Sequence, residues 1–278
     1  MVRPKSGGAN SPTTTGNGRA ARPPNSSACC EIHETRAPLK VRWKSLVLSF
    51  PRAFRRHLGA FQLAVGITLL GCAFGWFVIR QDPQAKSVLM PFAGLMESPA
   101  ERVAKEESAK ADRLKGVKAS FSADLMTHNI RVTMLAMAAG ITWGGGTVLV
   151  LFSNGVSLGA VAADYIGGGQ STFLAAWLLP HGSAEIPAIL LGGQAGFILA
   201  GALIGWGSHR SRTERFRLMA SDLFAIVAGA AGLLVWAGLV EAFVSQYHQP
   251  VIPYGLKIGF GVCELVALSA FLGWAGRE

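Results

Sequence analysis

A succession of apolar stretches, each close to the length that crosses a membrane, constrains this chain more than any other feature. The stretches lie at 58–79, 130–152, 155–180, 186–206, 223–244 and 256–276. About 20 apolar residues in a helix are enough to cross the hydrocarbon of a bilayer. Hydrophobic residues make up 50% of the chain and charged residues only 15%, which excludes an ordinary soluble domain. We therefore predict an all-α, polytopic transmembrane helical bundle.

The third apolar stretch, 155–180, is less regular than the others. Asp164 and the run Gly167-Gly168-Gly169 interrupt it. Irregular backbone at membrane depth must be surrounded by protein or line a wet cavity. We predict two short helices here, so that the bundle has about six crossings with a broken third span. A re-entrant hairpin at 155–180 is the alternative.

The positive charge of the chain is concentrated at two places. Of the 26 Lys and Arg residues, 11 precede residue 59, and four more lie between Arg210 and Arg217. Short basic loops stay on the cytoplasmic side of a membrane. Six crossings place the N-terminal tail, the loop 210–217 and the C-terminus there together. We expect a multi-pass protein of the cell (inner) membrane with a cytoplasmic N-terminus.

The basic residues are not accompanied by any sign of nucleic-acid binding. The sequence has no zinc-ligand spacing, no base-stacking motif and no signature of a nucleic-acid-binding fold. Basic clusters beside membrane spans can instead contact anionic headgroups. We expect membrane lipids, and not nucleic acid, as partners of these residues.

Composition divides the chain into three parts. Residues 1–40 are rich in Gly, Pro, Ser, Thr, Asn and Arg, which predicts a disordered cytoplasmic tail. Residues 41–57 mix large apolar side chains with Arg, which indicates a basic amphipathic segment on the membrane surface. Residues 58–278 form the transmembrane domain. It includes an outer helical loop at 80–127, where alternating acidic and basic residues indicate a solvated helix.

A polar motif, Pro180-His181-Gly182-Ser183-Ala184-Glu185-Ile186-Pro187, separates two apolar stretches. On one continuous helix, His181 and Glu185 would share a face at the spacing of a metal half-site. Gly182 and Pro187 favour a break instead, with Pro187 in the first turn of the next helix and Glu185 near its positive end. We expect an outer-side turn. Helix capping, contact with a partner or substrate, and metal binding all remain open roles.

Six crossings would bring polar residues from distant parts of the chain to one outer rim. These residues are His128, Asn129, Arg131, His181, Glu185, Glu241, His248 and Lys257. We expect Glu241 and Lys257 to form an ion pair between two helices. Glu264 lies near the middle of the last span, where a charged carboxylate must face the bundle or be protonated. A structural hydrogen bond and a proton-relay role are both open for Glu264.

The polar motif is one of five runs that carry a family resemblance. The runs lie at 121–132, 140–147, 152–159, 179–188 and 239–243. Their most specific positions are the pair Asn154 and Gly155, and the residues Pro180, Gly182 and Pro187 around His181 and Glu185. Taken together, the runs resemble the stage II sporulation protein M family of integral membrane proteins. The resemblance covers about residues 42–278.

This resemblance implies a polytopic helical protein without a demonstrated catalytic activity. In sporulating bacteria the namesake acts as a membrane scaffold that recruits peptidoglycan-degrading partners. We therefore expect a non-enzymatic scaffold for other membrane or envelope proteins, with no cofactor and no metal, and we leave an oligomer open.

Two other functions compete with the scaffold. A transporter or permease subunit would explain the irregular stretch 155–180 and the midplane Glu264, because broken helices form polar sites in transporters. An intramembrane metal-dependent hydrolase would use His181 and Glu185. No second ligand motif accompanies that pair in the sequence.

Overall fold

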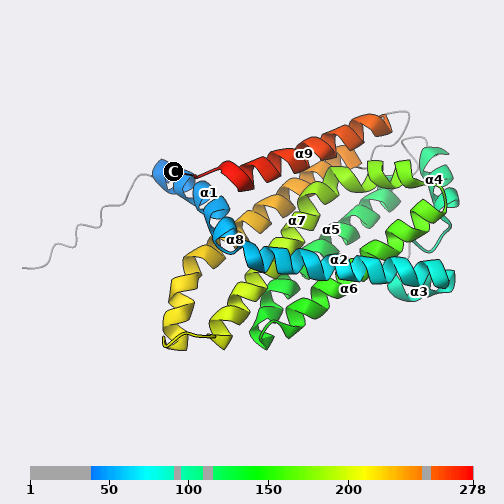
Figure 1. The fold of residues 1–278 in the computed structure, drawn as a ribbon. Coiled ribbons are helices and arrows are strands. Elements are labelled where there is room, and N and C mark those ends of the chain that lie inside the picture. The colour runs from blue at the N-terminus through cyan, green and yellow to red at the C-terminus, as the bar shows by residue number, and fades with distance from the viewer. Residues whose placement is uncertain (1–38, 91–94, 109–114, 246–251, 278) are drawn as a thin grey trace, which may run out of the picture. The chain divides into compact units, whose positions relative to one another are not determined.

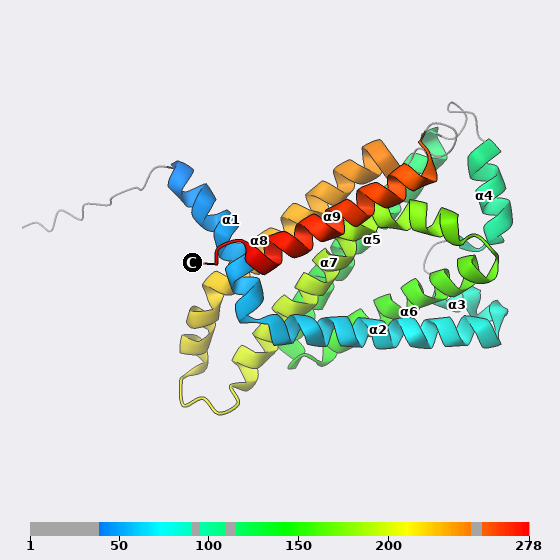
Figure 2. The same cartoon turned by 45° about the horizontal axis from the view of Figure 1, so that its top comes forward.

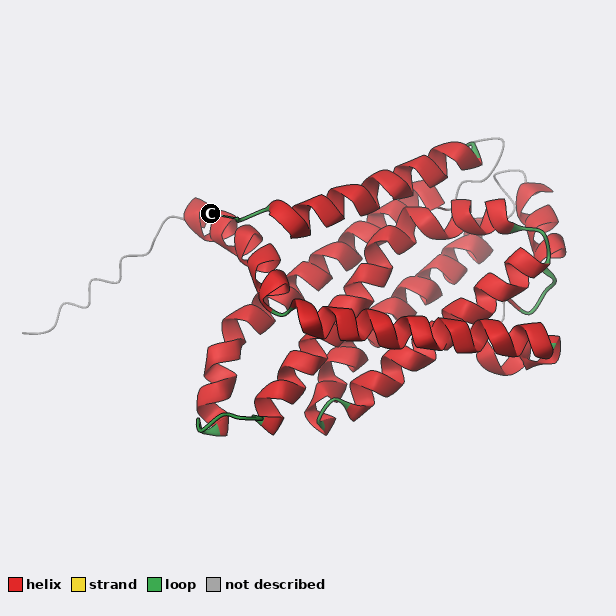
Figure 3. Cartoon of the chain, viewed as in Figure 1, coloured by secondary structure: helices red, strands yellow, loops and turns green. Residues whose placement is uncertain are grey.

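The computed structural model describes residues 39–90, 95–108, 115–245 and 252–277. These residues form helices joined by short connections and contain no strand (Figure 3). The predicted all-α helical bundle is confirmed. The predicted disordered tail lies outside the described residues, except for Leu39 and Lys40, which begin the first helix. His248 also lies outside them.

The helices follow one another with few long connections. In chain order they are α1 (Leu39–Arg56), α2 (Leu58–Gln81), η1 (Pro83–Ala85), α3 (Lys86–Leu89), α4 (Pro99–Ser108), α5 (Lys115–Ala138), η3 (Ala139–Thr142), α6 (Gly145–Gly167), α7 (Ser171–Ile204), α8 (Arg212–Val240), the π-helical turn η4 (Glu241–Ser245) and α9 (Tyr254–Trp274).

Five helices in the described part of the chain are long and apolar enough to cross a membrane. They are α2, α6, α7, α8 with its π-helical turn, and α9. Helix α5 is more polar but lies beside them, so that α2, α5, α6, α7, α8 and α9 alternate in direction along the bundle (Figures 1 and 2). The bundle therefore has two ends with different contents.

We name these two ends by what they contain. The arginine end carries the junction of α1 with α2, the turn η3, the loop from Gly205 to Ser211 and the C-terminal end of α9. The α4 end carries α3, α4, the connection between α6 and α7, and the start of α9. The basic loop and the C-terminal end of α9 thus lie at the same end of the bundle.

The structure corrects two predicted spans. The span predicted at 130–152 is wrong, because the chain reverses at η3, where Trp143 and Gly144 adopt left-handed backbone conformations with φ of 53° and 84°. The broken span predicted at 155–180 is also wrong. That stretch holds the end of α6, a short turn around Gly168 and Gly169, and the start of α7. The glycines do interrupt a helix there, but between two spans.

Helices α2 and α6 approach each other through reciprocal pairs of glycines. A Cβ atom added at Gly75 would lie 2.0 Å from the carbonyl oxygen of Val156, and one at Gly159 would lie 2.0 Å from that of Cys72. Gly71 and Gly155 face the partner backbone in the same way. Small residues four apart let membrane helices come into backbone contact. The sequence spacing at Gly71 and Gly75 therefore marks a real helix contact.

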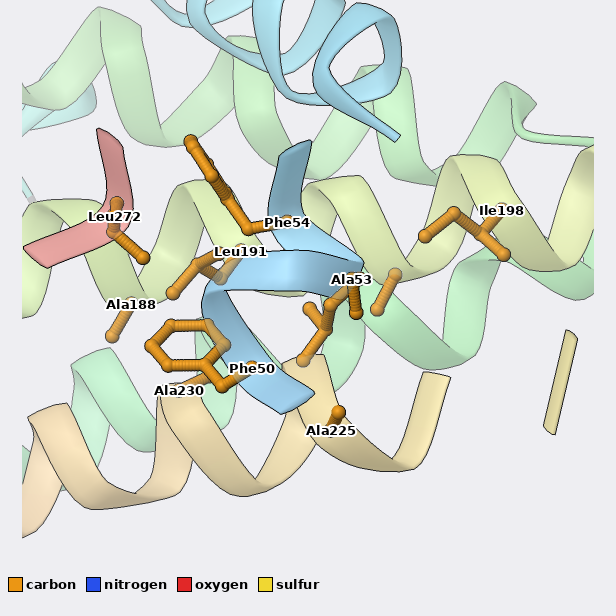
Figure 4. Packing of buried hydrophobic residues seen from close by; sticks show 11 residues of the cluster. Phe50, Ala53, Phe54, Ala188, Leu191, Ile198, Ala225, Ala230 and Leu272 are labelled. Atoms are coloured by element: carbon orange, nitrogen blue, oxygen red, sulfur yellow. The ribbon is translucent and has the colours of Figure 1, made fainter. Parts of the chain in front are cut away.

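Helix α1 packs across the arginine end of the bundle. Its buried Phe50, Ala53 and Phe54 gather in one cluster with residues of three later helices (Figure 4). These residues include Ala188 and Leu191 of α7, Ala225, Ile226 and Ala230 of α8, and Leu272 of α9. The segment predicted to lie on the membrane surface is therefore partly built into the bundle.

Polar contacts hold the junction of α1 and α2 in place. Arg56 Nη1 lies 2.7 Å from Asp222 Oδ1 on α8, and His57 Nε2 lies 3.0 Å from Oδ2 of the same carboxylate. The amide of Gln194 on α7 donates to the carbonyl oxygens of Phe54 and His57. The bond to Phe54 satisfies a carbonyl group in the last turn of α1, where helical partners are lacking, and the bond to His57 adds to those from the backbone amides of Ala60 and Phe61.

The glycine contact between α2 and α6 can be tested with a matched pair of substitutions. Gly159→Ala should destabilise the protein by about 1–3 kcal/mol, because the new methyl group meets backbone and the helices must separate. Gly66→Ala on α2 adds the same group where nothing lies within 4 Å, so it should be neutral or slightly stabilising. Unfolding in detergent measures both. Equal effects of the two substitutions would contradict the contact.

Candidate functional site

The polar motif lies inside a helix and not in a turn. Helix α7 continues through both Pro180 and Pro187, so the predicted outer-side turn is wrong. A proline removes one helical hydrogen bond and crowds the preceding turn, which bends a helix. Helix α7 is visibly bent along its length (Figures 1 and 2). His181 and Glu185 therefore do lie one turn apart on one continuous helix.

His181 pairs with a carboxylate from α8. Its Nδ1 lies 3.1 Å from Oε2 of Glu241, and the two side chains are 1% and 7% exposed. Glu241 is the first residue of the π-helical turn that follows α8. Such turns insert an extra residue into a helix and are frequent at functional sites. The pair joins α7 to α8 in the interior of the bundle.

Glu185 pairs with α5. The side-chain amide of Asn129 donates a hydrogen bond to Oε2 of Glu185, and both residues are buried. Glu185 also interacts electrostatically with His181 and Glu241. The predicted neighbours Asn129, His181, Glu185 and Glu241 are thus brought together, but within the bundle and not at an exposed rim.

Glu264 of α9 binds α7 on the face opposite to His181 and Glu185, because Ser183 lies two residues from each of them on the helix. Ser183 Oγ donates to Glu264 Oε2 over 2.7 Å, and the indole N–H of Trp236 on α8 donates to Oε1. Glu264 therefore faces the bundle, as its position near the middle of the span requires. These contacts link α7, α8 and α9 through one carboxylate.

The other predicted rim residues lie in different surroundings. Lys257 is 1% exposed and sits one turn before Gly261, which packs directly on the backbone of Leu179 in α7. His128 is half-buried, whereas Arg131 is exposed on α5. We use the name polar network for the half-buried Glu264 together with six buried residues, which are Asn129, His181, Ser183, Glu185, Glu241 and Lys257.

A cavity of about 90 Å³ adjoins the polar network. Its polar lining comes from His128 and Asn129 of α5, Asn154 and Ser157 of α6, and His181 and Glu185 of α7. Leu95 and Trp177 line it toward the α4 end. The space is large enough to hold a few water molecules beside these polar side chains. The motif position Asn154 therefore meets His181 and Glu185 at one cavity.

The remaining motif positions shape the helices around this cavity. Gly155 packs on the backbone of Thr68, so α6 is held close to α2. Gly182 is buried between Leu178 and Ile186, and Pro180 and Pro187 lie on either side of the polar residues of α7. These positions carry no polar side chain, and their role is to place the residues that do.

The arrangement supports two kinds of chemistry. A buried histidine beside carboxylates can exchange protons or attract a small cation, and intramembrane ionisable residues commonly serve such roles. The same contacts also tie α5, α7, α8 and α9 together. Among the described residues, no group of three His, Cys, Asp or Glu side chains is arranged to hold a metal ion.

Sequence reasoning missed several polar residues that join helices. Ser157 lines the cavity, Trp236 binds Glu264, and Asp222 and Gln194 hold the junction of α1 and α2. Asp222 and Gln194 each interrupt an apolar run, and such interruptions are costly in a membrane unless the residue has a partner. Their position in apolar sequence was therefore the sign that Asp222 and Gln194 have partners on other helices.

The pair of His181 and Glu241 can be tested by a double-mutant cycle. His181→Leu leaves Glu241 buried without its partner and should destabilise the protein by about 3 kcal/mol. Combining His181→Leu with Glu241→Met should cost less than the sum of the single changes, because the pair is removed as a unit. Unfolding in detergent provides the free energies, with the exposed Arg131→Gln as control. Additive energies would rule out coupling.

Comparison with known proteins finds a match to part of this chain. A relative from Methanocaldococcus jannaschii, described only as an uncharacterized protein, is 34% identical over 74 residues, which is 26% of this chain and 42% of that protein. The chain thus matches less than half the length of this relative. No solved structure matches the chain.

The pattern of a protein family covers much more of the chain. The family described as stage II sporulation protein M matches residues 64–246. This range holds the paired glycines of α2 and α6, the cavity and every residue of the polar network except Lys257 and Glu264. Since more than half of the chain is matched, and the helices have the apolar character of membrane spans, the chain is an integral membrane protein that belongs to the stage II sporulation protein M family.

Proposed function

We propose that the chain is a non-enzymatic membrane scaffold that docks cell-envelope or peptidoglycan-remodelling proteins on its α4 end. The single observation that carries this proposal is that α4 exposes charged side chains while its Arg102 packs on Trp177 of the bundle. A docking surface binds well when it does not have to be ordered first. The polar network then serves to hold the helices beneath that surface.

The anchor of α4 is a buried arginine. Arg102 is 5% exposed, and its guanidinium carbon lies 4.7 Å from the ring centre of Trp177 and 5.9 Å from that of Tyr165. A cation over an aromatic face is attracted by the electrons of the ring. Val103 on the next position is also buried in the cluster around these rings. Helix α4 is thereby fixed to α6 and α7.

Local bonds reinforce this end of the bundle. Ser98 and Glu101 form a capping box at the start of α4, in which each side chain bonds the backbone amide of the other. Hydrogen bonding from the side chain of Ser98, and from its backbone amide, holds the pKa of the Glu101 carboxyl below its usual range. Lys86 of α3 bonds both Asp164 and the carbonyl oxygen of Glu97. The exposed charges therefore sit on a defined backbone.

The orientation of the protein is part of the proposal. We place it in the cell (inner) membrane with the arginine end in the cytoplasm, because short basic loops are retained on that side. The α4 end then faces the envelope, where peptidoglycan-remodelling proteins act.

An ion-pair swap tests docking on α4. Lys105 Nζ lies 2.9 Å from Glu97 Oε1, so the double change Glu97→Lys with Lys105→Glu keeps the pair but reverses the surface charges. We expect recovery of peptidoglycan-degrading enzymes with the tagged protein to fall at least about tenfold, because like charges across an interface are strongly unfavourable. Quantitative mass spectrometry of proteins co-purified from the source cells measures this.

The matched control is the corresponding swap at the arginine end. Arg210 Nε lies 3.6 Å from Glu214 Oε1, and Arg210→Glu with Glu214→Arg reverses this pair in the same way. Recovery of partners should not change. Unchanged recovery with the α4 swap, or equal loss with both swaps, would show that α4 is not the docking site.

A second function, passage of protons or a small cation, is favoured by the cavity beside His181 and Glu185. Such a function places ionisable groups within the membrane and water beside them. Glu264 and Glu185 would be needed in their ionisable form, whereas a scaffold needs only their hydrogen bonds. The glutamine variants separate these requirements because glutamine keeps the size and much of the bonding of glutamate.

Flux measurements decide between the two functions. If the protein passes protons, vesicles that contain it should acidify under an imposed potential, as read by a pH-sensitive dye. Glu264→Gln and Glu185→Gln should each reduce that rate to the level of empty vesicles, while the exposed Glu214→Gln should not. A wild-type rate equal to that of empty vesicles would eliminate proton transport.

A further inference from the structure

A second cavity, remote from the polar network, lies at the arginine end. It has a volume of about 440 Å³ and is bounded by the start of α2, the last turns of α7, the loop after it and the first turns of α8. We name it the arginine-end groove. Neither the scaffold nor the transport proposal uses it.

The floor of the groove is apolar. Phe197 and Ile198 of α7, Ala60 of α2, and Leu218 and Met219 of α8 line it. Gly201 also lines the groove, and a Cβ atom added there would meet nothing within 4 Å. The open space therefore runs along α7 beside a helical position that has no side chain. An apolar lining of this kind favours a hydrocarbon chain over a polar ligand.

The rim of the groove is cationic. Arg210 and Arg215 both line it. The Arg210 side chain is 57% exposed and faces Glu214 at 3.6 Å through Nε, so the two arginines together leave a net positive charge at the rim. Arg215 donates to the carbonyl oxygens of Ala202, Leu203 and Arg210, which uses three of its five N–H groups. Two N–H groups of the Arg215 guanidinium are left to donate to a ligand, and the neutral carbonyl oxygens do not cancel its positive charge. Planar guanidinium groups bind phosphate well.

The surroundings of the groove have the character of a membrane interface. Trp206, which also lines the groove, is 95% exposed, and tryptophan concentrates at the level of lipid headgroups. Arg212 and Arg217 on the same end are exposed as well. Basic pockets between membrane helices on the cytoplasmic side are suited to anionic lipid headgroups.

We infer that the arginine-end groove binds one anionic phospholipid. Its phosphate lies against Arg210 and Arg215, and one acyl chain lies along Phe197, Ile198 and Met219 past Gly201. The charge complementarity at the rim selects the anionic headgroup, and the apolar trough requires a ligand with a hydrocarbon chain. The bound lipid joins the end of α7 to the start of α8. This inference is independent of what the α4 end docks.

Two variants test the two halves of the site. Arg210→Gln removes a rim charge, and its control, Arg217→Gln, removes an equal charge from α8 outside the groove. Gly201→Leu fills the trough, and its control, Gly232→Leu, adds the same side chain to α8 where nothing lies within 4 Å. Arg215 is left unchanged because it also caps α7.

Native mass spectrometry of the full chain in detergent, titrated with phosphatidylglycerol or phosphatidylcholine, measures lipid binding. We expect retention of one phosphatidylglycerol, weakened about fivefold by Arg210→Gln and at least as much by Gly201→Leu, with both controls like the wild type. Equal binding of the two lipids, or equal weakening by variants and controls, would overturn the inference. Thermal unfolding provides a further check. If inorganic phosphate alone raised the melting temperature as much as phosphatidylglycerol does, the inference would be overturned, because the acyl chain would then contribute nothing to binding.

Discussion

The pairing of ionisable side chains inside an apolar bundle is the constraint on which the rest of this structure depends. A buried carboxylate or ammonium group is costly unless a partner and hydrogen bonds compensate for lost water. Here the partners come from different helices, with His181 facing Glu241, Asn129 facing Glu185, and Ser183 facing Glu264. Each pairing therefore fixes the position of one helix against another, and a rotation of α7 would break all three together.

Close backbone packing complements this polar network. The contact of α2 with α6 is made by glycines and needs no polar partner, so it holds the opposite side of the cavity without adding charge. The bundle thus combines polar side chains on two opposite faces of α7, which specify the helices that surround it, with a glycine contact that sets how near α6 can come. The cavity lies between these two kinds of contact.

Hydropathy was a good guide to the fold where the chain runs straight and a poor one where it turns within apolar sequence. Helices α2, α8 and α9 fall on predicted apolar stretches, because length and composition alone decide that a helix can span a bilayer. The reversal at Trp143 was missed because its neighbours are apolar and a left-handed conformation leaves little trace in composition. The glycines at 144–146 were the sign of it.

The sequence predicted which residues meet in the candidate site, but not that they are buried. Which residues meet followed from counting crossings, and Asn129, His181, Glu185 and Glu241 do meet. Their burial was not foreseen, because Pro180 and Pro187 suggested the end of a helix. Proline inside a membrane helix is tolerated when neighbouring helices accommodate the bend. Only the tertiary arrangement distinguishes a bend from a break.

The way α1 docks has a consequence for the order in which the protein is assembled. Arg55 on α1 donates to the carbonyl oxygen of Leu272, and Arg52 donates to that of Gly276, so α1 is bound to the end of α9 and the turn after it. During synthesis these acceptors emerge after every other span. Helix α1 can therefore make these two bonds only after α9 has been inserted beside it.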